Sequence, residues 1–268
     1  MTGIRDDARV LRYAALCGFQ DFAGTYSVWS WVFGLFLRMM TQVAFFASIG
    51  RLLSSQQAVE YLLIGNAVAA APIGCLTATT ATTWERVAGT LPLLVASPTS
   101  ALLVLMGRSV FFMANGLAFA LGALLLVPPL FDVAIPPDRL PALVALVALV
   151  TTSTYFAATF LGGLVLNATS ARRTVPQVAR MAIMAFSGVS VPRSSFPEAL
   201  SWVGGVLPVT HGLDGVRELV GAGRVTVVVG DAALEALVGL GWLLASLATF
   251  HRLAAAGRRD GSIVFSTV

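Results

Sequence analysis

Six apolar runs dominate this chain of 268 residues, and all but one are long enough to cross a lipid bilayer as a helix. A spanning helix needs about 20 mostly apolar residues, because the hydrocarbon core is about 30 Å thick. Helices are the expected form, since every backbone polar group in that core needs an internal partner. The predicted spans are Val28–Leu53, Val59–Thr83, Leu103–Phe131, Leu140–Leu166, Val175–Val191 and Ala232–Phe250.

The composition agrees with a membrane location. Hydrophobic residues make up 57% of the sequence and charged residues 11%. Soluble domains carry about 25% charged residues, so this chain has too few to cover a water-exposed surface. We therefore expect an all-α integral membrane protein, in which residues 1–268 form a single transmembrane domain.

The positions of the basic residues and cysteines argue against a nucleic-acid partner, a disulfide and a metal site. All seventeen basic residues are Arg, and they gather at the ends of the predicted spans without forming a patch, so no nucleic-acid partner is predicted. The two cysteines, Cys17 and Cys75, are expected at different depths. Neither a disulfide nor a metal site is therefore predicted.

The distribution of Arg predicts the orientation. With a cytoplasmic N-terminus, eleven Arg residues fall in inner segments and five in outer segments, Arg38 left aside. Cytoplasmic segments carry the positive excess in membrane proteins. Six spans then place both terminal segments, 1–27 and 251–268, in the cytoplasm. The Arg-only, Ala- and Val-rich composition is typical of a GC-rich bacterial genome, so a bacterial plasma membrane is the expected location.

The segment Gly188–Arg217 interrupts the pattern of spans. Three prolines break its backbone, and charged side chains lie among them. A spanning helix does not tolerate so many breakers and charges, whereas broken backbone at membrane depth is tolerated where protein or a watery cavity surrounds it. We predict a re-entrant helical hairpin within residues 188–224, dipping into the outer face without crossing.

The connection over residues 84–102, between the second and third spans, is too long for a simple turn. Glu85 and Arg86 end the second span, Gly89 and Pro92 break the backbone, and a short apolar patch follows. A short helix that offers this patch to a soluble partner explains the length. A helix lying flat on the membrane explains it equally, and both readings stay open.

The N-terminal segment carries Arg5, Arg9 and Arg12 at helical spacing, with apolar residues on another face. This pattern predicts a helix along the inner membrane surface. Arg38 is the one charge inside the first apolar run. It lies either within the bilayer or near the head groups, and we favour the second because an interfacial helix over Thr25–Leu37 would let it reach them.

Two of these segments resemble type 2 ABC export permeases, the ABC-2 family. The inner connection has the pattern E-R-x-x-G-T-L-x-x-L-x-x-S-P, in the residues Glu85, Arg86, Gly89, Thr90, Leu91, Leu94, Ser97 and Pro98. The outer segment ends in P-x-T-H-x-x-D-x-x-R, which looks most like the daunorubicin-resistance branch of drug and lipid exporters. Its matching residues are Gly188, Pro192, Pro197, Trp202, Pro208, His211, Asp214 and Arg217.

The resemblance implies a dimer of two permeases, identical or paralogous, each engaging a separate cytoplasmic ABC ATPase. The inner residues would then form a coupling helix, and the outer residues a gate at the exit. ATP and Mg would bind to the partner, since the Walker A motif needs a Lys and this chain has none. The chain would bind no cofactor, be no enzyme by itself, contact membrane lipid, and export a hydrophobic or amphiphilic drug, antibiotic or lipid.

Other functions find less support in the residues. Ser201, His211 and Asp214 could form a hydrolase triad, but the chain has no G-x-S-x-G elbow. Proton-driven antiport would need carboxylates buried within the spans, and none is expected there. The competing class is a membrane assembly or signalling component that shares the fold without moving a substrate.

Overall fold

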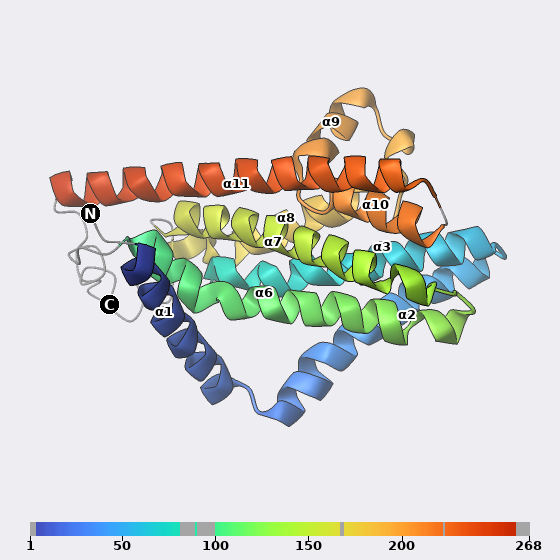
Figure 1. The fold of residues 1–268 in the computed structure, drawn as a ribbon, viewed down its shortest axis with the longest axis horizontal. Helices are drawn as coiled ribbons and strands as arrows, with labels where there is room; N and C mark the ends of the chain where they lie inside the picture. Colours follow the sequence, from blue (N-terminus) through green and yellow to red (C-terminus); the bar gives the residue numbers. More distant parts are fainter. Residues whose placement is uncertain (1–3, 81–88, 90–99, 167–168, 222, 261–268) are drawn as a thin grey trace.

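The computed structural model describes residues 4–80, 89, 100–166, 169–221 and 223–260, and 87% of these described residues are helical. The long helices lie side by side as a bundle (Figure 1). We call the end where α1 begins and α11 ends the terminal end, and the opposite one the far end. The long helices are α1 (Ile4–Thr25), α2 (Leu37–Leu52), α3 (Gln56–Cys75), α6 (Ala101–Leu126), α7 (Leu140–Val165) and α11 (Val225–Asp260).

Shorter elements connect the long helices. Three short α-helices fill the region before α11: α8 (Thr174–Phe186), α9 (Glu198–Val206) and α10 (Thr210–Val220). A π-helical stretch precedes α2, namely η1 (Ser30–Phe36). The 3-10 turns are η2 (Pro128–Phe131), η3 (Pro137–Arg139), η4 (Thr169–Arg172) and η5 (Arg193–Ser195).

Five helical stretches of the described chain are long and apolar enough to cross a membrane, which confirms the prediction of a helical membrane protein. They are Ser30–Leu52, Gln56–Thr80, Ala101–Phe131, Pro137–Val165 and Val225–Leu253. The prediction of six spans is not confirmed. The fifth predicted span, Val175–Val191, contains α8, which ends after 13 residues. A helix of that length measures about 20 Å, short of the hydrocarbon core.

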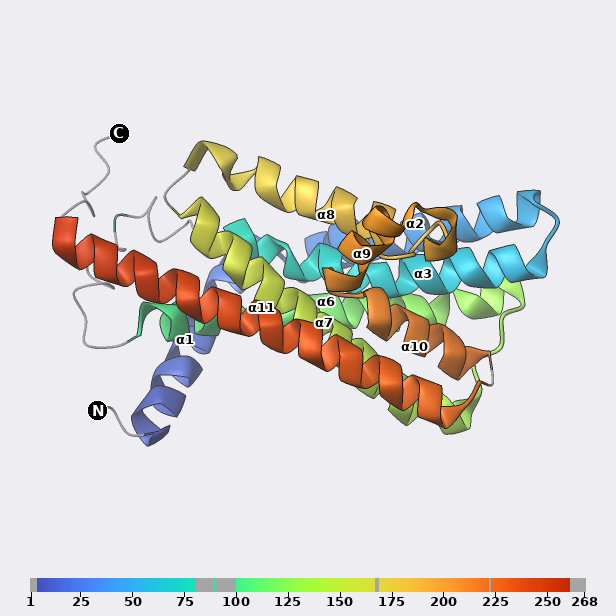
Figure 2. The same ribbon diagram turned by 90° about the horizontal axis from the view of Figure 1, so that it is seen from above.

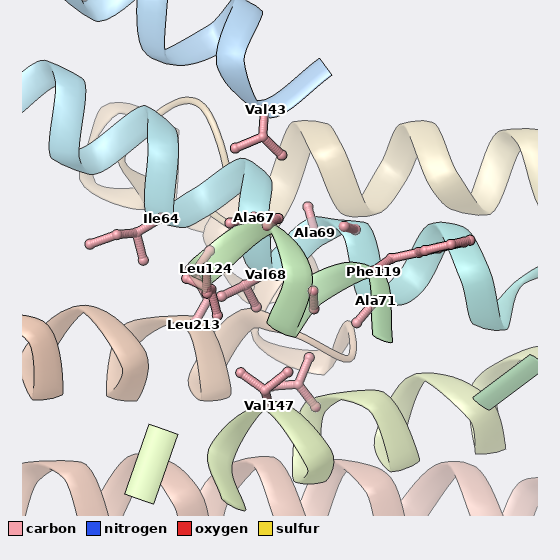
Figure 3. Packing of buried hydrophobic residues seen from close by; sticks show 14 of the residues in the cluster. Val43, Ile64, Ala67, Val68, Ala69, Ala71, Phe119, Leu124, Val147 and Leu213 are labelled. Carbon is pink, nitrogen blue, oxygen red and sulfur yellow. The ribbon is translucent and has the colours of Figure 1, made fainter. Parts of the chain in front are cut away.

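Helix α3 lies at the centre of the bundle and contacts α2, α6, α7 and α10. Its middle, Ala67–Ala71, is buried and almost free of large side chains. Small residues let helices approach closely in a membrane, where association depends on packing. A Cβ added at Gly74 would lie 2.5 Å from the Cα of Gly116 in α6, so the two backbones touch. Figure 3 shows the apolar side chains that meet around this helix, Val68 and Val147 among them.

The first two helices form a V against the side of the bundle (Figure 1). The chain is non-helical at Tyr26 and Ser27, and η1 then continues directly into α2. The separate helix predicted over Thr25–Leu37 is therefore wrong, since its second half belongs to a candidate span. Helix α1 packs on α6, with the rings of Phe22 and Phe111 4.3 Å apart at their centroids. Its position on a membrane surface stays a prediction.

We expect Gly116→Val to lower the Tm of the detergent-solubilised protein, followed by thermal unfolding. A Cβ at this position would lie 2.6 Å from the carbonyl oxygen of Ala71 and 2.8 Å from Sγ of Cys75, which forces α3 and α6 apart. Overpacking of this kind costs about 1–3 kcal/mol. Gly241→Val is the control, because nothing lies within 4 Å of a Cβ added there. Equal losses in both variants would contradict close packing of α3 on α6.

Candidate functional site in the hairpin between α8 and α11

The chain between α8 and α11 folds back on itself instead of running the length of the bundle. Helix α8 starts at the terminal end and stops partway along, where η5 and α9 form a projecting turn (Figure 2). Gly188 follows α8 with a φ of +78°, a conformation that glycine adopts at little cost. Helix α10 then enters the bundle and contacts α3, α7 and α11. Its Leu213 is fully buried in the main core (Figure 3).

Arg217 of α10 joins three parts of the chain. Its Nη2 lies 3.2 Å from the carbonyl oxygen of Tyr61 in α3, 2.9 Å from that of Gly188 and 3.2 Å from that of Val189. Its guanidinium carbon lies 3.6 Å from the centroid of the Tyr61 ring, a cation–π contact. The Tyr61 hydroxyl also donates to the Gly188 oxygen, at 2.6 Å. Arg217 and Tyr61 together supply the donors for the carbonyls left open where α8 ends.

Asp214 lies between two guanidinium groups. One oxygen is 3.5 Å from Nη1 of Arg193, and the other is 3.9 Å from Nη1 of Arg217. Burial raises the pKa of the Asp214 carboxyl above its usual value, and the two Arg charges act in the opposite direction. Burial likewise lowers the pKa of Arg217, while Tyr61 and Asp214 act against that change. The arrangement links η5 to α10 through charges that are partly removed from solvent.

Glu235 of α11 holds the start of α10. Its side chain is fully buried, and its two carboxylate oxygens accept from the backbone N–H groups of Val209, at 3.0 Å, and Gly212, at 3.1 Å. The first N–H groups of a helix have no partner within the helix, and a carboxylate placed there satisfies them and the helix dipole. The expectation that the spans bury no carboxylate is therefore wrong. The two hydrogen bonds show what this carboxylate does: it caps α10.

Val209 adopts a backbone conformation that is rare for its residue type. Its φ is +93°, and the side chain is fully buried. A β-branched residue is strained at positive φ and keeps such a conformation only where its surroundings impose it. The hydrogen bond from its N–H to Glu235 supplies one such restraint. The turn from α9 into α10 thus depends on a contact with α11.

Polar contacts also close the turn between α9 and α10. The Thr210 hydroxyl donates to the carbonyl oxygen of Gly204 at 2.6 Å, and Nε2 of His211 lies 3.1 Å from that of Gly205. Nε1 of Trp242 in α11 donates to the carbonyl oxygen of Val206 at 3.1 Å. His211 and Asp214, two members of the hydrolase triad considered above, are thus engaged with a backbone carbonyl and with Arg side chains.

Some of the residues predicted for the outer segment lie close together in the structure. Other residues, which were not predicted to be part of this site, contact them. Gly188, His211, Asp214 and Arg217 lie within the connected contacts described above, and Pro208 is buried beside them. Trp202 is 72% exposed on α9, away from this network, while Pro192 and Pro197 flank η5. The added residues are Tyr61, Arg193 and Glu235. A lone carboxylate inside an apolar run is the signal that could have found Glu235.

The predicted coupling residues, Glu85, Arg86, Thr90, Leu91, Leu94, Ser97 and Pro98, lie outside the described residues. Gly89 is described, and its φ is +72°. That value lies in the left-handed region, which glycine adopts at little cost. The described helices on either side, α3 before the connection and α6 after it, meet the connection at the terminal end (Figure 1).

These features define a polytopic helical membrane protein with a broken, charge-anchored hairpin near one end. A family model described as ABC-2 family transporter protein matches residues 48–256. This match covers most of the chain and includes both segments with the resemblance, so the chain belongs to the ABC-2 transporter family. It is a permease component of an ABC transporter, a membrane subunit of a family that associates with an ABC ATPase. No curated protein and no solved structure matches it.

We expect Glu235→Ala to lower the Tm and to expose Arg217 to trypsin, with the cleavage site identified by mass spectrometry. The substitution leaves the N–H groups of Val209 and Gly212 without partners, at about 1–3 kcal/mol for each unsatisfied group. Glu235→Gln keeps one acceptor oxygen, so its effect should be smaller. Glu198→Ala, an exposed carboxylate at the start of α9, is the control. If Glu235→Ala behaves like this control, the capping role is excluded.

Proposed function

We propose that this chain forms the transmembrane pathway of a bacterial exporter that moves a hydrophobic or amphiphilic molecule, such as a drug, an antibiotic or a lipid, out of the cell. ATP and Mg would bind to the separate ATPase subunit, and two permeases, identical or paralogous, would enclose the route. The observation that carries the proposal is the family match over residues 48–256. The resemblance to the daunorubicin-resistance branch supports the class of cargo.

In this proposal the hairpin acts as the gate at the exit. Arg217 joins it to Tyr61 of α3, and Glu235 joins it to α11, while Asp214 links Arg193 and Arg217 within it. It is thus a broken segment, held by these polar contacts and by the packing of α10 on α7 and α11, rather than a long continuous helix. The positive-inside distribution of Arg supports an outer position for it, with both termini in the cytoplasm and the chain in the plasma membrane.

Coupling to the ATPase is assigned to the connection at the terminal end. Its residues Glu85, Arg86, Gly89, Thr90, Leu91, Leu94, Ser97 and Pro98 would form the helix that seats on the ATPase. The described helices that flank the connection, α3 and α6, approach it at the terminal end, whereas α9 and α10 lie in the other half of the bundle, and this supports the division of roles (Figure 1). ATP hydrolysis would then drive a rearrangement that travels along the bundle from one end to the other.

The coupling assignment is tested by Leu91→Asp/Leu94→Asp. We expect the variant to lose the co-purifying ATPase subunit, because two charges replace the apolar patch that the ATPase would cover. The readout is the amount of ATPase retained by the tagged permease. Leu52→Asp/Leu53→Asp is the matched control, since these exposed leucines lie at the far end of the bundle. Retention of the ATPase by the first variant, or its loss from the second, would refute the assignment.

The gate assignment is tested by Arg217→Ala and Arg217→Lys. Both variants remove the guanidinium group that contacts three carbonyl oxygens, and a Lys ammonium does not reproduce the planar geometry of that group. We expect an at least roughly tenfold loss of ATP-dependent efflux of daunorubicin or of a fluorescent phospholipid, with the ATPase still bound, since loss of a charged hydrogen bond costs about 1.5–3 kcal/mol. Arg224→Ala, an exposed Arg after α10, should transport normally. Wild-type efflux by both Arg217 variants would exclude the gate role, and a folded complex without any efflux in the wild type would favour a non-transporting assembly component.

A further inference from the structure

A cavity lies inside the V formed by the first two helices. It has a volume of about 410 Å³ and is lined by residues of α1, η1, α2, α3, α6 and α8. Its lining includes Phe22 of α1, Ile73 of α3 and Pro176 of α8, so it lies where these helices approach one another. Its size falls within the range of small-molecule sites, which runs from about 300 to 1,000 Å³.

Three arginines, Arg38, Arg173 and Arg180, are among the residues that line this cavity. None of its described lining residues is Asp or Glu. Arg38 and Arg180 lie close enough for their like charges to repel each other. Arg180 donates to Oε1 of Gln42 at 3.2 Å, a neutral partner. The nearby carboxylate of α1, Asp21, is paired with Arg108. The cavity therefore concentrates positive charge that no described carboxylate offsets.

The rest of the lining is largely apolar and aromatic. Phe112 and Phe119 of α6 face the cavity together with Met39 and Ile73. Trp31 stacks on Phe119 at a centroid distance of 5.9 Å and donates to the amide oxygen of Asn115, another lining residue, at 2.8 Å. The site thus combines cationic groups with an apolar chamber. An Arg pair recognises phosphate or carboxylate through charge-assisted hydrogen bonds, and an apolar wall suits a hydrocarbon chain.

We propose that this cavity binds an amphiphile with an anionic head group of the phosphate-monoester kind. The head group contacts Arg38, Arg173 and Arg180, and the acyl chain lies along Phe112 and Phe119. Basic pockets between transmembrane helices bind anionic lipid head groups in the same way. The binding stands independently of transport, and only its meaning as the place where cargo is taken up rests on the proposed function.

The test measures lipid binding to the full chain by native mass spectrometry in maltoside detergent. The probes are dioleoyl phosphatidic acid and dioleoyl phosphatidylcholine, with the same acyl chains and different head-group charge. We expect the wild type to bind the phosphatidic acid at least roughly tenfold more tightly, as loss of charge-assisted hydrogen bonds predicts. Arg38→Gln/Arg173→Gln should remove most of this preference. The matched control is Arg51→Gln/Arg224→Gln, which removes the same charge at the far end.

A second variant separates the cavity from surface charge. Thr77→Phe fills the cavity from the helical turn that follows α3 and leaves all three Arg residues in place, so it should also weaken binding of phosphatidic acid. Equal binding of the two lipids, an unchanged preference in Arg38→Gln/Arg173→Gln, or full binding in Thr77→Phe would overturn the proposal. So would displacement by millimolar inorganic phosphate, which would indicate a site for the free anion. The assay needs no ATPase, so failed binding leaves the permease assignment intact and failed transport leaves the cavity intact.

Discussion

A broken backbone inside a helical bundle needs polar partners that water cannot supply, and the hairpin between α8 and α11 is built around this need. Where α8 stops, Arg217 and Tyr61 donate to the open carbonyls of Gly188 and Val189. Where α10 starts, Glu235 accepts from the open N–H groups. One cation and one anion thus satisfy the two ends of the interruption. An unsatisfied polar group in hydrocarbon costs several kcal/mol, so the position of α10 depends on both.

Packing decides how these charges can reach their partners. Helix α3 can bring the carbonyl of Tyr61 to Arg217 because Gly65, one turn along, has no side chain, and a Cβ there would lie 2.8 Å from Nη2 of Arg217. At Gly65 an added Cβ would lie 2.1 Å from the carbonyl oxygen of Val189. At Gly212 it would lie 2.1 Å from Cγ2 of Val150 in α7. Glycines therefore allow the approach of the backbones, and the charged groups fix the approach once it is made.

Much of the fold follows from the apolar runs, and the site follows from them only in part. The prolines and charges of Gly188–Arg217 were sufficient to predict a segment that does not cross, because breakers act locally. They could not show that α8 stops after 13 residues, since Val175–Val191 is apolar almost throughout. Glu235 was missed because a single carboxylate hardly changes the mean hydropathy of a long apolar run. Tyr61 gave no signal, because its role depends on a carbonyl brought close by the fold. The cavity depends on Arg38, which is far in sequence from Arg173 and Arg180 and joins them in one lining only in the folded chain.

Helix α11 runs from Val225 to Asp260 as 36 residues without a break. Its length is about 54 Å, and about 38 Å separates Glu235 from its last residue. If α11 is treated as a straight rod with a rise of about 1.5 Å per residue, a tilt of about 5° about Glu235 would move its last residue by about 3 Å. The carboxylate that caps α10 therefore belongs to a helix whose longer part, after Glu235, reaches the terminal end. A small displacement there changes the angle at which the cap of α10 is held.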